Sequence, residues 1–302
     1  MKKSERIHRR EVLRSAGAIA LTGALGASGK NAMSQARQSP IRPRTLALVG
    51  DYAHNCDAIR VSLNRLFKEL DLPIDYTTNY YDLSKSLLEP YQLFVFFRDN
   101  YIFPNGRNLP AARPQSAIGT AGGGAFANAE YWVTEEQGQA VKEFVAAGNG
   151  LYSLHSNAFV SRSSKNYRDV QGGVGLNHPP LRPFKVRVVN KEHPVTQGIE
   201  DFMVTDEQHY TIYDKDPKNI LLHSENVDGL TFDAVLRDPK EGGPEASGPR
   251  QNLGTTAISG WAHEYGQGKV VFTAMGHTIH SMWQPEYIKL QKNAVRWLLK
   301  IG

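Results

Sequence analysis

The sequence predicts an α/β protein in which a mainly parallel sheet is flanked by helices and followed by a strand-rich second half. Continuous apolar runs at residues 45–50, 93–97 and 150–154 have the composition of strands covered on both faces. Segments with apolar residues at helical spacing separate these runs. Strands that alternate with helices in this way are typical of a parallel sheet.

The first half of the chain contains alternating elements. In order, they are strands at residues 45–50, 74–78, 93–97 and 150–154, and helices at residues 57–70, 83–89 and 135–147. Thr134 is a favourable N-cap for the last of these helices, and Glu135 and Glu136 place negative charge at the positive end of its dipole. Gly148 is a typical residue to stop it before the next strand.

The second half is richer in strands and contains long loops. Strands are predicted at residues 184–189, 202–210, 220–223, 232–236, 257–261 and 269–274, and a terminal helix at residues 285–299. Residues 98–132 have no clear period and are rich in Gly, Pro, Asn and Ala, which is typical either of a partly ordered lid over the strand ends or of a disordered insert. Residues 157–183 form a second predicted loop.

The N-terminus has the layout of an export signal. Basic residues precede an apolar run at residues 16–27, which is too short to span a bilayer. Arg9 and Arg10 look like the pair of a twin-arginine signal. We therefore expect residues 1–37 to be a twin-arginine export signal and linker, and residues 38–302 to form a single domain. The mature protein would be periplasmic or secreted, without stable membrane insertion.

The positive charge of the chain belongs to this signal. Residues 1–37 hold eight Lys/Arg and two Asp/Glu, a charge of +6 against +5 for the whole chain, so the remainder carries −1. A basic surface for nucleic acid is therefore not expected. The only cysteine is Cys56, so no intramolecular disulfide can form.

Three histidines follow predicted strand ends: His54, His155 and His277. Parallel strands of one sheet place their carboxyl ends at one edge, where ligands of open α/β sheets bind. We expect the three side chains to converge there, although a histidine at such a place can also simply satisfy a nearby carbonyl group.

Glu207 is the expected carboxylate partner, with His209 as a further candidate on the same face of an extended segment. If a metal is bound, a divalent ion such as zinc held by His155, Glu207 and His277 would keep an open position for substrate or water. The same groups without a metal could perform acid/base catalysis. The sequence leaves both readings open.

Six aromatic residues could stack on a sugar ring: Tyr80, Tyr81, Tyr101, Trp132, Tyr210 and Trp261. Of these, we expect Tyr210 and Trp261 to bind substrate. Aromatic residues with this spacing are also common in protein cores, so this interpretation is open as well.

Several segments together resemble one family. They are residues 148–156, residues 193–196, Asp206-Glu207 with Tyr210, and residues 261–277. This pattern resembles the ThuA-like family, named for trehalose utilisation, and implies a flavodoxin-like fold of the class I glutamine amidotransferase-like superfamily. In the amidotransferases a strand-to-helix elbow carries a catalytic cysteine, and the comparable place here is His155. The resemblance therefore does not imply a cysteine-dependent glutamine amidotransferase.

The resemblance implies a role in carbohydrate metabolism that includes 3-keto derivatives of disaccharides. Our leading hypothesis is an exported enzyme that acts on a carbohydrate or an oxidised (3-keto) sugar by hydrolysis or isomerisation. His155, Glu207 and His277 would be catalytic, and His54, His209, Tyr210 and Trp261 would bind substrate. The alternatives are a non-catalytic sugar-binding accessory module that works with a sugar dehydrogenase, and a metal-dependent hydrolase of an unrelated amide or ester.

Overall fold

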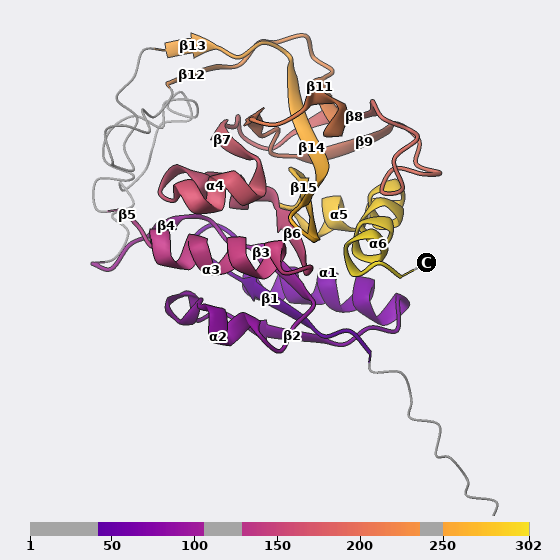
Figure 1. Ribbon diagram of the computed structural model, residues 1–302. Helices are drawn as coiled ribbons and strands as arrows, with labels where there is room; N and C mark the ends of the chain where they lie inside the picture. The colour runs from indigo at the N-terminus through magenta and orange to yellow at the C-terminus, as the bar shows by residue number, and fades with distance from the viewer. Residues whose placement is uncertain (1–41, 106–128, 236–249, 302) are drawn as a thin grey trace, which may run out of the picture. The chain divides into compact units, whose positions relative to one another are not determined.

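The computed structural model describes residues 42–105, 129–235 and 250–301, all within one compact unit. The predicted export signal lies outside the described residues. A nine-stranded sheet runs through the centre of the unit (Figure 1). None of the helices in the described ranges has the length and apolar character needed to cross a membrane.

The sheet has a parallel half and an antiparallel half. In spatial order, its strands are β2 (Ile74–Thr77), β1 (Thr45–Val49), β3 (Leu93–Phe97), β6 (Gly150–Leu154), β15 (Gly268–Thr273), β14 (Thr256–Tyr265), β11 (Ile220–Asn226), β8 (Arg182–Val188) and β9 (Phe202–Asp206). The pairs from β2 to β15 are parallel, and those from β15 to β9 are antiparallel. The predicted α/β fold with a strand-rich second half is confirmed.

Helices cover both faces of the parallel half. On one face lie α1 (Cys56–Glu69), α5 (Ile279–Met282) and α6 (Pro285–Leu299), and on the other lie α2 (Lys85–Leu88), α3 (Glu135–Ala146) and α4 (Lys165–Gln171) (Figure 1). Alternate strand residues enter the two cores: Ala47 and Val49 pack with α1, and Leu46 and Leu48 pack on the opposite side. A strand buried on both faces must be apolar at every position, which explains the continuous runs in the sequence.

The helix ends follow from local sequence. The Asn55 side chain accepts hydrogen bonds from the first backbone N–H groups of α1, and Thr134 forms a reciprocal capping box with Gln137 at the start of α3. Pro285 occupies the first turn of α6, where its missing N–H has no cost. The terminal helix predicted at residues 285–299 is confirmed.

Two predictions about the chain path were wrong. The predicted loop at residues 157–183 contains most of a 3₁₀ helix (His155–Arg162), then α4 and β7 (Gly173–Asn177). The sequence gives no sign of these elements because they are too short to show a period. The predicted strand at residues 202–210 ends at Asp206, and a new strand, β10 (Tyr210–Tyr213), pairs with β7 instead.

The remaining described elements are short. They are β4 (Tyr101–Ile102), β5 (Glu130–Tyr131), β12 (Asp233–Val235), β13 (Arg250–Asn252), and 3₁₀ turns at Tyr80–Asp82 and Pro217–Asn219. Strands β4 and β5 pair with each other at the two ends of the predicted loop at residues 98–132. Most of that loop, residues 106–128, lies outside the described residues, so its prediction as a lid or insert stays a prediction.

Trp261 and His263 of β14 hold the C-terminal end of α4. The Trp261 indole donates a hydrogen bond to the Gln171 carbonyl oxygen (2.8 Å) and stacks on Phe272 in the core. His263 Nε2 donates to the Val170 carbonyl oxygen (3.0 Å). Trp261 is completely buried, so the expectation that it binds substrate is corrected: its ring is a core element, because α4 and β7 cover it.

We expect His263→Gln to flatten the pH dependence of stability between about pH 6.5 and about pH 4. Burial lowers the pKa of His263 from 6.5 to about 4. Within this window the unfolded state takes up a proton that the folded state does not bind. The wild-type protein should therefore lose about 3 kcal/mol of stability as the pH falls, and the variant should keep it. Denaturant unfolding of both proteins at several pH values measures the difference, and parallel curves would contradict the assignment.

Candidate functional site

The carboxyl ends of the parallel strands bring three histidines together. His54 follows β1, His155 directly follows β6, and His277 follows β15. The His54 ring centroid lies 4.8 Å from that of His155 and 5.0 Å from that of His277. The structure thus places all three at one edge of the sheet, as expected from strand order.

Glu207 lies at the centre of a histidine cluster. One carboxylate oxygen, Oε2, is 3.1 Å from His277 Nδ1 and 3.4 Å from His155 Nε2. The same oxygen is 3.5 Å from both His178 Nδ1 and His209 Nε2. Among the ion pairs of the described residues, every one that Glu207 makes is therefore with a histidine. Glu207 follows β9, so the antiparallel half of the sheet supplies the carboxylate.

His155 occupies a strained elbow. Its φ angle is +51°, a left-handed conformation that is uncommon for any residue other than glycine. The side chain is completely buried, and its Nδ1 lies 2.7 Å from the Ala274 carbonyl oxygen. A carbonyl oxygen only accepts hydrogen bonds, so Nδ1 carries the proton and Nε2 faces Glu207. Gly276 provides the space for the His155 side chain, because a Cβ atom at position 276 would lie 3.1 Å from the His155 Cβ.

Asp51 orients His54. Its carboxylate oxygens lie 2.8 and 2.9 Å from His54 Nδ1, and they also accept the backbone N–H groups of Ala53, His54 and Asp99. Burial would raise the pKa of Asp51, but the charge and hydrogen bond of His54 lower it to about 2, so the carboxyl group is ionised. Nδ1 of His54 is therefore the donor, and Nε2 points into the cluster without a partner among the described residues.

Asp206 joins the two halves of the sheet at this point. It is completely buried and accepts hydrogen bonds from the backbone N–H groups of Gly276 (2.8 Å), Glu207 (2.8 Å) and His277 (3.1 Å). The Asp206 carboxylate thus fixes the backbone position of both Glu207 and His277.

The pKa values of the cluster residues are shifted in different directions. Burial would raise the pKa of Glu207, but hydrogen bonding, above all to His155, outweighs it and holds that pKa far below its usual range. Burial would lower the pKa of His155, but the Glu207 hydrogen bond and the charge of Asp206 outweigh it, so that pKa is raised. Burial lowers the pKa of both His178 and His209. The result is an ionised carboxylate beside two neutral imidazoles.

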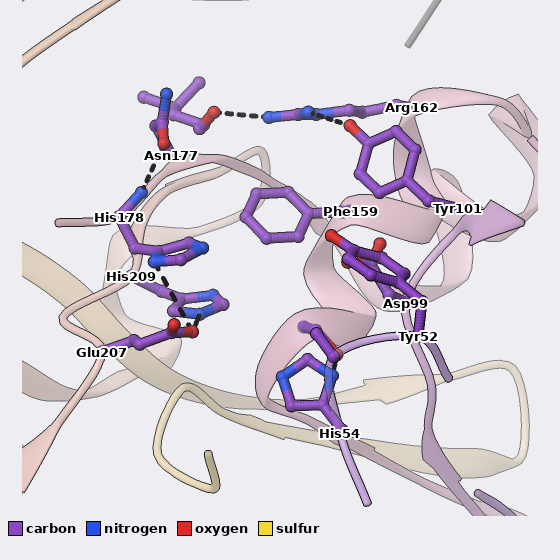
Figure 2. Close-up of a pocket in the computed structure, with 13 residues that line it drawn as sticks. Tyr52, His54, Asp99, Tyr101, Phe159, Arg162, Asn177, His178, Glu207 and His209 are labelled. Carbon is purple, nitrogen blue, oxygen red and sulfur yellow. Dashed lines mark hydrogen bonds and ion pairs between the residues drawn. The ribbon is translucent and has the colours of Figure 1, made fainter. Parts of the chain in front are cut away.

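A cavity of about 270 Å³ opens in front of the cluster. Figure 2 shows His178, His209 and Glu207 on one wall, and Tyr52, Asp99, Tyr101 and His54 on the other. Phe159 lies between the two walls, and Arg162 donates a hydrogen bond to the Tyr101 hydroxyl (2.7 Å) (Figure 2). The volume is close to the lower end of the usual range for ligand pockets, about 300 Å³.

Not every predicted site residue lines this cavity. His155 and His277 contact Glu207 and His54 but do not line the cavity. Tyr210 lies elsewhere: its hydroxyl donates to the Gly254 carbonyl oxygen (2.8 Å) and its ring packs on Phe232. The expectation that Tyr210 binds substrate is therefore corrected, because β10 turns away from β9 and takes the ring with it.

Sequence reasoning missed several residues of the site. Asp51 and Asp99 come two residues after the ends of β1 and β3, so the strand-end rule that indicates the histidines indicates them as well. His178 and Arg162 had no such signal, because they lie in or next to short elements of the supposed loop at residues 157–183.

Comparisons with known proteins agree with this architecture. A sequence model of the ThuA family, described as trehalose utilisation, matches residues 49–298. A ThuA-like protein from Bacteroides uniformis ATCC 8492 is similar in structure, with a TM-score of 0.53 and 18% identity over 86% of this chain and 93% of its own. A ThuA-like protein from Parabacteroides merdae ATCC 43184 has a TM-score of 0.52 and 16% identity over 85% of this chain and 90% of its own. At these identities the likeness shows the fold alone. A search of curated proteins gave no match in sequence.

We expect Asp206→Ala to lower the free energy of unfolding by about 3 kcal/mol or more, because three backbone N–H groups lose their acceptor at a buried place. The control is Asp201→Ala, just before the same strand. Asp201 is partly exposed and accepts one backbone N–H, from Val188, so its loss should cost only about 1 kcal/mol. Equal losses in denaturant unfolding would show that Asp206 does not hold the two halves together.

Proposed function

Because this chain belongs to the ThuA family, described as trehalose utilisation, we propose that it is an enzyme that acts on a carbohydrate or an oxidised (3-keto) sugar by hydrolysis or isomerisation. The family membership supports the carbohydrate-related role. The observation that favours an enzyme is the ionised Glu207 beside the neutral His178 and His209 in the wall of a cavity. Perturbed titratable groups gathered in a cleft are typical of catalytic sites.

Both reactions need a group that accepts a proton from water or from a sugar carbon. A general base works best when its pKa is near the working pH, and the pKa of Glu207 is far lower. Glu207 is therefore better suited to stabilise a positive charge on a neighbouring group. His178 is better suited to accept the proton. Its Nδ1 donates to the Pro179 carbonyl oxygen (3.0 Å), so its Nε2 keeps a lone pair. His209 stacks on it, with ring centroids 4.6 Å apart.

The other cavity residues would bind the sugar. Asp99, Tyr101 and Arg162 make part of the cavity wall polar, and Phe159 offers an apolar face. A keto sugar forms by oxidation of a hydroxyl group, so a sugar dehydrogenase is the expected source of such a substrate. The accessory-module alternative depended on aromatic residues, of which Tyr101 lines the cavity whereas Tyr210 and Trp261 do not.

The first test is an NMR time course of the protein with trehalose, other disaccharides and their 3-keto forms. We expect His178→Gln and Glu207→Gln each to lower kcat by about 10²- to 10⁴-fold, the usual contribution of a positioned acid or base. Glu264→Gln is the matched control, because Glu264 is exposed at the end of β14 and should turn over sugar like the wild type.

Two results would count against the proposal. Unchanged turnover in both site variants would remove the assigned groups from the reaction. Sugars that bind but stay chemically unchanged with the wild type would favour the accessory module.

We also propose that residues 1–37 direct export through a twin-arginine pathway. Replacing Arg9 and Arg10 together by lysine keeps the charge but removes the arginine pair. We expect the variant to stay in the cytoplasm of a host with a twin-arginine translocase, while the wild type reaches the periplasm. Cell fractionation and immunoblotting measure this, and equal export of both would contradict the signal assignment.

A further inference from the structure

Four side chains at the edge of the sheet are arranged like the ligands of one metal ion. His54, His155, Glu207 and His277 each offer a ligand atom, and these atoms all lie within 4.8 Å of one another. They come from the ends of β1, β6, β9 and β15, so four separate strands hold them. His54 is 5% exposed and His155 is completely buried.

The free nitrogens of the histidines meet without well-oriented hydrogen bonds. His54 Nε2, His155 Nε2 and His277 Nδ1 are buried, and none forms a well-oriented hydrogen bond among the described residues, although Glu207 Oε2 lies 3.4 Å from His155 Nε2 and 3.1 Å from His277 Nδ1. A buried polar atom without a partner is costly, and native structures rarely leave several of them at one place. For His54 and His155, the opposite nitrogen is already used, by Asp51 and by the Ala274 carbonyl oxygen.

One bound proton does not satisfy this arrangement. A proton on His155 Nε2 or on His277 Nδ1 would bridge to Glu207 Oε2, 3.4 Å and 3.1 Å away, but His54 Nε2 would stay without a partner among the described residues. Protonating all three histidines would bury three positive charges side by side. A single cation at the centre, by contrast, accepts a lone pair from each imidazole and from the carboxylate.

We propose that His54, His155, His277 and Glu207 bind one divalent transition-metal ion, with zinc as the representative ion. Imidazole and carboxylate ligands suit such ions. Two donors on one zinc ion, each at about 2.1 Å, can lie at most about 4.2 Å apart, so small side-chain rotations bring all four into range.

The surroundings of the ligands have the features of an outer metal shell. A metal-binding histidine commonly donates its other N–H to a carboxylate or a backbone carbonyl, which fixes the ring and its tautomer. Asp51 does this for His54, and Ala274 does it for His155. Asp206 holds the backbone of Glu207 and His277. Asp51 and Asp206 are therefore positioning residues of the site.

The chemical consequence of this inference rests on the proposed function. A metal here would lie behind the cavity wall at Glu207 and would supply a Lewis acid for a bound water or sugar oxygen. His178 and His209 are outside this ligand set and stay available for proton transfer. Binding itself is argued from geometry alone, so it is tested without substrate.

The experiment measures zinc rather than turnover. The full chain is stripped with a chelator and titrated with Zn²⁺ by calorimetry, and the metal content after dialysis is measured by mass spectrometry. We expect one zinc ion per wild-type chain. His54→Ala and His277→Ala should each lose it, and Asp51→Asn should bind about 10- to 100-fold more weakly, the usual cost of an outer-shell change.

His178→Gln is the matched control, because His178 contacts Glu207 but lies outside the ligand set. It should keep zinc. Circular dichroism confirms folding, and if His54→Ala fails to fold, the more exposed His277 provides the test. Absence of stoichiometric zinc in the wild type, or wild-type affinity in both ligand variants, would overturn the proposal. Loss of zinc in His178→Gln with retention in His54→Ala would also overturn it, since the ion would then be bound by His178, Glu207 and His209 instead.

The two proposals fail separately. Zinc bound by the wild type with no sugar converted would contradict the proposed function alone. Sugar conversion by a protein that binds no zinc would contradict the metal site alone.

Discussion

The partial burial of the Glu207 carboxylate is the constraint around which this edge of the sheet is built. An ionised carboxylate removed from water needs charged or hydrogen-bonding partners, or its cost is several kcal/mol. Here all its ion-pair partners among the described residues are histidines, and two of them follow strands of the parallel half. The neighbouring Asp206 binds backbone N–H groups at the end of β15. The two halves of the sheet are thus joined at the cluster of Glu207, Asp206 and the histidines.

The site is rigid because hydrogen bonds and packing fix the side chains of His54 and His155. Asp51 holds His54, the Ala274 carbonyl oxygen holds His155, and Gly276 leaves space for the strained backbone of His155. Strain of this kind persists only where the surrounding structure enforces it. Groups held in this way are preorganised, which favours both metal binding and catalysis. The cavity in front then presents the less constrained His178 to a ligand.

Much of the fold could be predicted because its strongest signals are local. The buried strands of the parallel half are continuous apolar runs, and caps such as Thr134 mark helix starts. The segment at residues 157–183 was misassigned because α4 and β7 are shorter than the window in which a period can be recognised. The break after Asp206 was missed for a related reason: β10 pairs with β7, which had itself been assigned to a loop.

The sequence by itself determined that His54, His155 and His277 stand at the ends of strands, and parallel order then requires those ends to share one edge. The tertiary structure alone decided which ring nitrogen each histidine directs at Glu207, that His178 joins the cavity wall, and that Trp261 belongs to the core. The physical reason is distance along the chain. Strand ends follow from neighbouring residues, whereas the direction of a side chain depends on hydrogen-bond partners and packing that folding brings from remote segments.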